Sequence, residues 1–345
     1  MISAWVELSG EAPALAAAEA VAAAEALGGD AAPDPSLGDV GLVGVRLPSD
    51  STVPQLAARL ALAHRCLRAL ASGDEIGPTL ERAGKGGGTA AVRRLGRPTS
   101  GATDGGVLGA GAAFKRGGGQ IRLANPEHRY WLVDDLNGTD HLLEEGAAVD
   151  RRAVSDRRMP SLPFQRPVSL PPRFARAAAN LARVRPGDRV VDPFVGTGAL
   201  LAEAGLLGAR LFGIDRDPEM VRGALRNLGH LGLAAEELIV GDAGTSEFRD
   251  PSTPFDAIVT DPPYGRASST GGEGAREVVA RVLPRWAERV RPGGRIVIVV
   301  PGPIDVPGPE WTSVLRATVR VHRSLTREFR VFERSGATAT RRPTT

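Results

Sequence analysis

Three groups able to hold an amine follow one another in the sequence: the Asp261 carboxylate, the Pro262 carbonyl and the Tyr264 ring. They come directly after an apolar run at 255–259, whose length and β-branched residues predict a buried strand. The strand must end there, because Pro262 and Pro263 have no N–H to donate to a sheet. We therefore expect the three groups to project together from the carboxyl end of a central strand, where open α/β sheets bind their ligands.

The chemistry that these groups suit is methyl transfer to an exocyclic amino nitrogen. Such a nitrogen is a poor nucleophile, because its lone pair is delocalised into the base. A carboxylate and a carbonyl oxygen can each accept one N–H and so aim the lone pair at a sulfonium methyl, while an aromatic ring stacks on the base. Orienting reacting groups can lower an activation barrier by roughly 7–11 kcal/mol in general, and positioning of this kind can supply several kcal/mol of that reduction. The Asp-Pro-Pro-Tyr sequence resembles the motif of amino-methyltransferases acting on DNA, RNA or protein glutamine; the alternative is a proline-rich loop with a capping Asp.

A loop with two glycines and two further carboxylates predict a cofactor site. A strand expected at 189–192 leads into Asp192-Pro193-Phe194-Val195-Gly196-Thr197-Gly198, where the glycines let the backbone come close to a ligand just before a helix N-terminus. Asp215, ending the next expected strand, could accept both ribose hydroxyls, and Asp242, after the third, could accept from an adenine amine. Helix capping by these acids is the alternative, but acids at four successive strand ends favour ligand binding.

An NAD site is an alternative for the same loop, because such a site also has an acid about 20 residues after a glycine-rich turn. The pyrophosphate of NAD requires a third glycine in G-x-G-x-x-G, and the sixth position counted from Gly196 is Leu201. S-adenosylmethionine has no pyrophosphate, so it is the cofactor that the sequence favours.

These residues need a scaffold of alternating strands and helices, and the sequence predicts one from about residue 173 to the end. Strands are expected at 189–192, 210–215, 237–241, 255–260, 294–300, 314–323 and 325–333, and helices at 174–183, 198–207, 218–231 and 274–291. Such alternation predicts an α/β, Rossmann-like domain with a mostly parallel seven-stranded sheet covered on both faces. The last two strands, joined by a short turn, should form an antiparallel hairpin at one edge.

The N-terminal half predicts smaller α/β elements. Residues 1–53 predict a strand, an alanine-rich helix and a second strand. Residues 54–75 predict another helix, because apolar residues recur there at three- and four-residue spacing. The many glycines between 101 and 119 depart from the pattern of a well-formed helix. From 150 to 172 the composition changes to Arg, Pro and Ser, which is typical of a linker.

The formal net charge is only +3, but the charge is unevenly distributed. Residues 1–45 hold seven acids and no Lys or Arg, whereas 82–130 hold nine basic residues against two acids and 151–185 hold nine arginines against one aspartate. This asymmetry indicates a polyanionic partner that touches some parts of the chain and avoids another. A genome rich in arginine would explain the preference for Arg over Lys, but it would not explain the clustering.

Several classes of protein and site find little support in the sequence. No segment approaches the ~20 apolar residues of a membrane span, and no Lys or Arg precedes Arg46, which argues against a targeting leader. The single cysteine, Cys66, excludes a disulfide framework and fits a reducing cytoplasm. The five histidines are scattered without metal-ligand spacing, so we expect no metal site.

Three short segments of the N-terminal half carry a resemblance: Ala63-His64-Arg65, Ala91-Val92-Arg93-Arg94 and Ile121-Arg122-Leu123-Ala124-Asn125-Pro126-Glu127. They resemble the THUMP domain, an RNA-binding module that grips the acceptor end of tRNA. The resemblance implies a ferredoxin-like α/β domain at 1–53, a THUMP domain at 54–149, an Arg/Pro-rich linker at 150–172 and a methyltransferase domain at 173–345. tRNA is then the expected polyanion, and the residues expected to contact it are Arg93, Arg94, Arg151, Arg152, Arg157 and Arg158.

A closer resemblance is carried by 169–213, which includes Asn180-Leu181-Ala182-Arg183-Val184-Arg185-Pro186-Gly187-Asp188, by Asp261-Pro262-Pro263-Tyr264-Gly265-Arg266, and by Val321-His322-Arg323-Ser324-Leu325-Thr326-Arg327. These stretches are similar to the archaeal THUMP-containing tRNA (guanine10-N2)-dimethyltransferase family. The similarity implies a guanine amine held by Asp261, Pro262 and Tyr264. It also implies S-adenosylmethionine held by Asp192, Phe194, Gly196, Thr197, Gly198, Asp215 and Asp242. Val195, where such proteins usually have Cys, and Ala199, where a second Gly is common, depart from the pattern.

The resemblance implies an enzyme that methylates N2 of a guanosine in tRNA, at position 10, with one methyl followed by a second. N2 of another tRNA or ribosomal guanine and N6 of adenine are alternatives of the same chemistry, although an RNA-binding half disfavours DNA. A catalytically inactive tRNA-binding protein is the alternative of another class, and the intact cofactor acids argue against it. We expect a cytoplasmic monomer whose partners are tRNA and S-adenosylmethionine.

Overall fold

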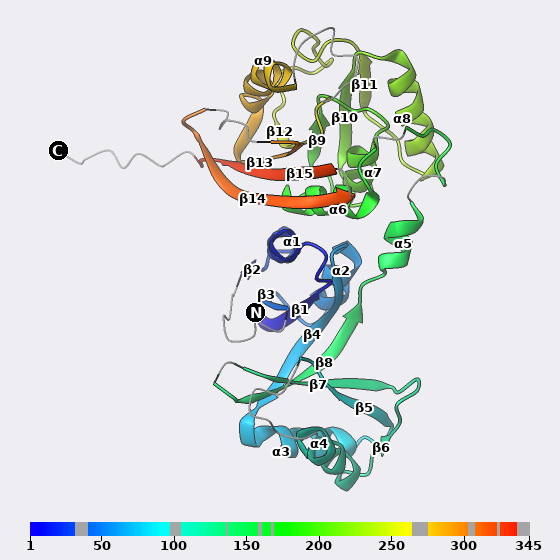
Figure 1. The fold of residues 1–345 in the computed structure, drawn as a ribbon, viewed down its shortest axis with the longest axis vertical. Coiled ribbons are helices and arrows are strands. Elements are labelled where there is room, and N and C mark those ends of the chain that lie inside the picture. The colour runs from blue at the N-terminus through cyan, green and yellow to red at the C-terminus, as the bar shows by residue number, and fades with distance from the viewer. Residues whose placement is uncertain are drawn as a thin grey trace, which may run out of the picture. The chain divides into compact units, whose positions relative to one another are not determined.

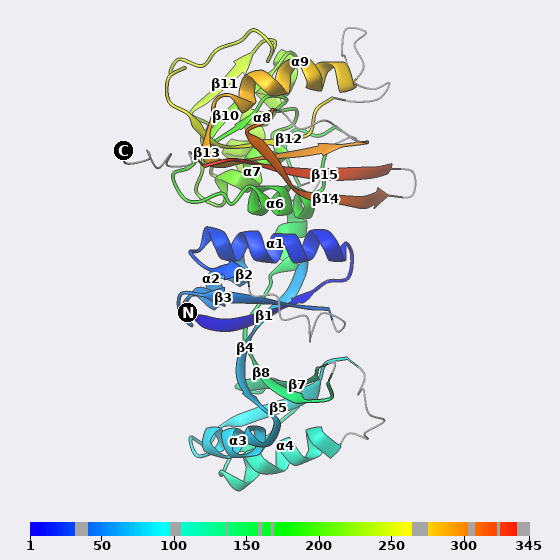
Figure 2. The same cartoon turned by 90° about the vertical axis from the view of Figure 1, so that its left-hand side faces the viewer.

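The computed structural model describes residues 1–31, 41–96, 105–135, 137–157, 161–166, 169–263, 275–302, 308–322 and 325–336. The chain forms two compact units, Met1–Asp150 and Arg151–Thr345 (Figures 1 and 2). Two of the predicted site residues, Tyr264 and Arg158, lie outside the described residues. The finer division of the first unit into a ferredoxin-like and a THUMP domain stays a prediction.

The first unit is built on one eight-stranded sheet with the strand order β2-β3-β1-β4-β8-β7-β5-β6. Helices α1 and α2 pack with β1, β3 and β4 in one core, whereas α3 and α4 pack with β5 and β7 in another. The elements in chain order are β1 (Ile2–Leu8), α1 (Pro13–Ala26), β2 (Asp30–Ala31), β3 (Leu42–Leu47), α2 (Thr52–Arg59), β4 (Ala63–Ser72), the short 3₁₀ helix η2 (Gly73–Glu75), α3 (Ile76–Gly84), β5 (Thr89–Arg94), α4 (Gly105–Arg116), β6 (Gln120–Ile121), β7 (His128–Asp134) and β8 (Asp140–Ala148).

The single helix predicted at 54–75 is wrong. Helix α2 ends at Arg59, and the chain continues as β4, which pairs with β1 on one side and β8 on the other. The break between them is held by Glu19 of α1, which is fully buried and accepts the backbone N–H groups of Ala61 and Leu62 at 3.0 and 2.9 Å. Since Glu19 is 42 residues from Ala61, local periodicity could not reveal this contact.

The glycine-rich stretch contains a well-formed helix, α4, contrary to the expectation from its composition. Its buried residues include Ala110, Ala113 and Phe114, which pack in the core shared with α3. Glycine is required where the two helices meet, because a Cβ on Gly84 would lie 2.2 Å from the Phe114 carbonyl oxygen. Glycine here permits a close helix–helix contact, and burial of the apolar face offsets its low helix propensity.

The second unit confirms the predicted α/β, Rossmann-like architecture. Its seven-stranded sheet has the order β11-β10-β9-β12-β13-β15-β14. Neighbouring strands from β11 to β13 run parallel, and β15 pairs antiparallel with both β13 and β14. The elements are α5 (Arg151–Asp156), α6 (Pro172–Leu181), β9 (Arg189–Asp192), α7 (Ala199–Gly205), β10 (Arg210–Asp215), α8 (Pro218–His230), β11 (Glu237–Val240), β12 (Phe255–Thr260), α9 (Ala275–Ala287), β13 (Val290–Val300), β14 (Trp311–His322) and β15 (Leu325–Arg334).

Helices cover both faces of this sheet, as Figures 1 and 2 show. On one face Val282 and Trp286 of α9 pack in a core with Phe255, Ile258 and Ile296 of the strands. Helices α6 and α7 lie on the opposite face (Figure 2). Helix α5 lies inside the stretch predicted as a linker. No helix in the described parts of the chain is both long and apolar enough to span a membrane.

Candidate active site

Carboxylates from several strands meet at the carboxyl edge of the second sheet. Asp192 is the last residue of β9, Asp215 is the last residue of β10, and Asp261 follows β12 directly. Because β10, β9 and β12 are adjacent and parallel, their carboxyl ends share one edge. Asp242 follows β11, the next strand outward, so the edge holds all four acids predicted from the sequence.

Asp192 lies at the centre of this group. Its side chain is almost fully buried, and its Oδ1 accepts the Thr260 hydroxyl at 2.7 Å and the Phe194 N–H at 3.0 Å. Burial raises the pKa of Asp192 to about 7, and although the two hydrogen bonds oppose this, the nearby charges of Asp261 and Asp215 raise it further. The edge is therefore an electronegative site in which an added cation would be stabilised.

The loop between β9 and α7 turns through two left-handed glycines, with φ of 50° at Gly196 and 83° at Gly198. Gly198 also packs closely on α8, since a Cβ there would lie 3.1 Å from the Ala224 Cβ. The loop is fixed to Asp215, whose Oδ2 accepts the Gly196 N–H at 2.8 Å. Glycine is needed at these positions because a side chain would be strained by the backbone angles and, at 198, by α8.

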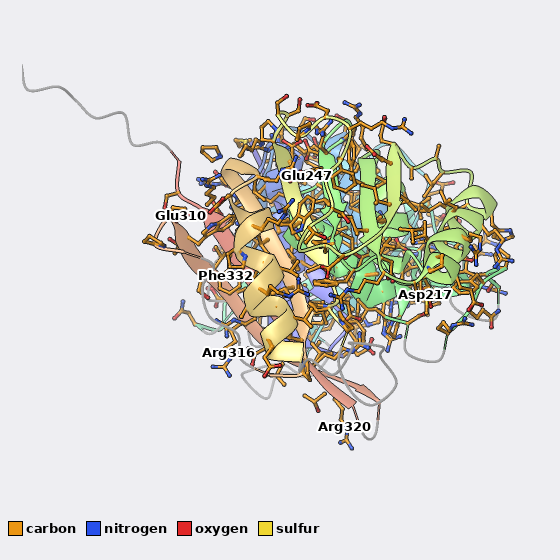
Figure 3. The ribbon with its side chains drawn as sticks, turned by 90° about the horizontal axis from the view of Figure 1, so that it is seen from above. Asp217, Glu247, Glu310, Arg316, Arg320 and Phe332 are labelled. Atoms are coloured by element: carbon orange, nitrogen blue, oxygen red, sulfur yellow. The ribbon has the colours of Figure 1, made fainter. Side chains whose placement is uncertain are left out.

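Asp215 has both oxygens engaged by backbone groups, since its Oδ1 accepts the Asp217 N–H at 2.9 Å. A carboxylate oxygen has more than one acceptor direction, so these bonds orient Asp215 without excluding ribose hydroxyls. Burial raises the pKa of Asp215. Asp217 in turn accepts the Glu219 N–H at 2.7 Å and caps α8. Figure 3 labels Asp217 on one side of the second unit and Arg316 of β14 on the other.

Asp242, predicted to accept from an adenine amine, is held by two arginines. Its Oδ2 pairs with Arg216 and its Oδ1 with Arg281 of α9 at 3.2 Å, while Oδ1 also accepts the Gly244 N–H at 2.6 Å. Burial raises its pKa, but the hydrogen bonds from Arg216, Gly244 and Arg281 outweigh burial and lower the pKa to about 2. Asp242 is therefore charged at neutral pH, and an adenine would have to share it with these arginines.

Asp261 is bound by an arginine that the sequence did not single out. Its Oδ2 accepts from Arg327 Nη1 of β15 at 2.5 Å. The Arg327 side chain is only 3% exposed and that of Asp261 18%. Pro262 is buried beside them, and Tyr264, the third member of the predicted group, lies outside the described residues. Arg327 ends the stretch 321–327 that carries the family resemblance, but its partner is 66 residues away and so the sequence assigned it no role.

A second residue missed from the sequence is Asn227 of α8. It is 1% exposed, accepts the Phe164 N–H at 2.9 Å, and donates to the carbonyl oxygens of Phe164 and Thr197 at 2.9 and 3.0 Å. Ser169 adds a hydroxyl contact to Thr197 at 3.0 Å. Part of the predicted linker is thus fastened to the cofactor loop. A polar residue on the buried face of α8, beside Ala224 and Leu228, is the signal that could have revealed it.

The arginines predicted to contact phosphates differ in their surroundings. Arg93 is exposed and donates to the Leu123 carbonyl at 3.3 Å, and the Arg152 side chain is 91% exposed. Arg94, by contrast, is 10% exposed and paired with Asp134 and Asp140. Arg157 makes two hydrogen bonds to the buried carboxylate of Glu203, at 2.7 and 2.9 Å. Arg151 is partly exposed.

Comparisons with known proteins agree with the methyltransferase architecture. Residues 161–308 match the family model described as "RMKL-like, methyltransferase domain". A tRNA (guanine(10)-N2)-dimethyltransferase of Methanothermobacter thermautotrophicus is 40% identical over 191 residues, which are 54% of this chain and 56% of that protein. An enzyme of the same name from Pyrococcus abyssi is 38% identical over 186 residues, 53% of this chain and 55% of that protein. The matched region thus spans about half the length of these curated relatives.

Among solved structures, the chain is similar to TrmN from Thermus thermophilus, with a TM-score of 0.50. The match covers 97% of this chain and 100% of that one, at 22% sequence identity. At this identity the likeness bears on the fold alone.

Proposed function

We propose that this chain is a methyltransferase that uses S-adenosylmethionine to methylate the exocyclic N2 amine of a guanosine in tRNA, at position 10, first once and then twice. The observation that carries the proposal is the carboxyl edge of the second sheet, where a glycine loop and the acids Asp192, Asp215 and Asp242 adjoin Asp261 and Pro262. The curated relatives, which match about half of this chain, are named for that reaction.

The donor set fits S-adenosylmethionine better than a dinucleotide. The carboxylates of Asp192 and Asp215 would repel a pyrophosphate, whereas they favour a sulfonium and an α-ammonium group. Leu201, where a dinucleotide site needs its third glycine, is fully buried in the helix after the loop. Asp215 would hold the ribose, Asp242 the adenine amine, and the loop from Asp192 to Gly198 the remainder of the cofactor. When bound, S-adenosylmethionine would supply an electrophilic methyl group.

The chain's own residues would orient the amine. Asp261 and the Pro262 carbonyl accept the two N–H groups of guanine N2, and Tyr264 stacks on the base. No strong base is needed before transfer, because the nitrogen sheds its proton after the new bond has formed. The target guanine has to leave its stack to reach the edge, at a cost of a few kcal/mol. The monomethylated amine keeps one N–H, which allows a second transfer if the amine rotates.

The first unit and the segment after it would bind tRNA through phosphate contacts, a salt-sensitive term that is largely blind to sequence. The exposed Arg93 and Arg152 and the partly exposed Arg151 suit this role. Arg94 and Arg157 would act indirectly, because their guanidinium groups are committed to acids of the chain. We further propose a monomer that works in the cytoplasm without a metal ion.

Incubating the pure protein with labelled S-adenosylmethionine and an unmodified tRNA transcript, followed by nucleoside analysis, tests the proposal. We expect N2-methylguanosine and then N2,N2-dimethylguanosine, lost when guanosine 10 is replaced by adenosine. Label in N6-methyladenosine would contradict the guanine assignment, and label at another guanine would contradict position 10. No label in tRNA or ribosomal RNA would indicate an inactive binding protein.

A further inference from the structure

The contact between Arg327 and Asp261 joins two strands that are not neighbours in the sheet. Strand β13 lies between β12 and β15, pairing Thr260 with Ile298 on one side and Val300 with Glu328 on the other. Since Val300 is the last residue of β13, Arg327 lies just beyond its end. The antiparallel strand β15 therefore brings its first residues to the same edge at which β12 delivers Asp261, and the guanidinium reaches across the end of β13.

The pair of Arg327 and Asp261 lies among other charged residues. Asp192 lies close enough to Asp261 for the negative charge of Asp261 to raise its pKa, so the edge concentrates negative charge. The neighbour of Arg327 in β15, Glu328, is engaged by Arg316 at 2.9 Å and Arg330 at 3.1 Å. A buried guanidinium is costly to desolvate unless it has a partner, and Arg327 has Asp261 at 2.5 Å.

We propose that Arg327 is a positioning residue for the transfer reaction, which rests on the proposed function of Asp261. The guanidinium holds Oδ2, which fixes the rotation of the carboxylate and presents Oδ1 to the substrate amine. Its positive charge also offsets the repulsion between the carboxylates of Asp261 and Asp192. The hairpin β14–β15 then orients the substrate in addition to completing the sheet.

Replacing Arg327 tests this assignment through the rate of methyl transfer. With saturating tRNA and S-adenosylmethionine, we expect kcat of Arg327→Gln to fall by about 10²-fold, the loss typical of a misplaced reacting group. We expect the KM for tRNA and the Kd for S-adenosylmethionine to change by less than about threefold, because in this assignment Arg327 acts through Asp261. Arg327→Lys, which keeps the charge, should recover part of kcat. The matched control is Arg330→Gln, a buried, ion-paired arginine of the same strand, which should keep kcat within about threefold.

A double-mutant cycle with Asp261→Asn separates positioning from a general structural role. If Arg327 acts through Asp261, adding Arg327→Gln to Asp261→Asn should change the single-turnover rate by less than about threefold. Losses that multiply would overturn the proposal, and so would a native kcat in both Arg327 variants. If Arg327→Gln does not fold, the kcat of Arg327→Lys is measured instead. A native kcat of Arg327→Lys, or its failure to fold, would assign Arg327 a structural role. An unaltered protein that transfers no methyl to RNA would instead refute the proposed function itself.

Discussion

Asn227 offers a prediction whose magnitude can be worked from the structure. Its side chain satisfies the N–H and carbonyl of Phe164 and the carbonyl of Thr197, all at 2.9–3.0 Å, and it is 1% exposed. Asn227→Leu keeps the branched shape and the number of side-chain heavy atoms but removes all three hydrogen bonds. Each buried group left without a partner costs about 1–3 kcal/mol. Allowing for some entry of water, we expect the free energy of unfolding to fall by about 3 kcal/mol.

The same change should loosen the cofactor loop, because Thr197 loses its tie to α8. One lost hydrogen bond of about 1–1.5 kcal/mol corresponds to roughly tenfold weaker binding of S-adenosylmethionine. Urea denaturation and isothermal titration calorimetry measure the two effects. Arg222→Gln, at an exposed position of the same helix, is the control and should alter neither. A stability loss below about 1 kcal/mol with unchanged cofactor affinity would refute the role assigned to Asn227.

Three further predictions concern the site and its surroundings. Burial raises the pKa of Asp192 to about 7, and a cationic cofactor favours its ionised form. The affinity for S-adenosylmethionine, measured by calorimetry, should therefore rise from pH 6 to pH 8, and an affinity independent of pH would contradict this. Gly223→Ala puts a Cβ 2.0 Å from the Phe164 ring, and the overpacking should cost about 1–3 kcal/mol against a gain of ~1 kcal/mol in helix propensity. We therefore expect a lower urea midpoint, and a higher one would contradict this prediction. Arg93→Gln with Arg152→Gln should flatten the salt dependence of tRNA binding by about 0.7–0.9 for each phosphate that is no longer neutralised, whereas Arg249→Gln should leave the slope unchanged.

The pKa of Asp192 also has a consequence for stability. It is raised above its value of about 4 in an unfolded chain, so the folded state keeps a proton between about pH 4 and 7 that the unfolded state has lost. Stability therefore falls as the pH rises through this window, by about 4 kcal/mol from this group alone. Most of this loss is present at neutral pH, where a bound cation would favour the charged form of the carboxylate.

The second unit could be predicted almost element by element, because the patterns of alternating strands and helices depend on residues that are close together in the sequence. The strands expected at 189–192, 210–215 and 255–260 have those bounds, and Asp192, Asp215 and Asp261 follow from where such strands end. The closing hairpin was also foreseen, since two strands joined by a short turn pair with each other.

Errors arose where a distant carboxylate decides the local structure. Glu19 ends α2 from 42 residues away, which turned a predicted helix into α2 and β4. The phosphate contacts expected of Arg94 and Arg157 stay predictions, but the sequence did not reveal that Asp134 and Glu203, 40 and 46 residues further on, pair with these arginines. An ion pair of this kind depends on the tertiary fold, so neither composition nor periodicity could reveal it.

The central claim is that the carboxylate after β12 presents the amine and does not hold the cofactor. Its most direct test is the transfer of labelled methyl to tRNA by Asp261→Ala, measured together with the Kd for S-adenosylmethionine. We predict a loss of at least about 10²-fold in transfer with cofactor affinity within about threefold of the unaltered protein. Transfer retained within about tenfold, or cofactor binding abolished by the substitution, would contradict the claim.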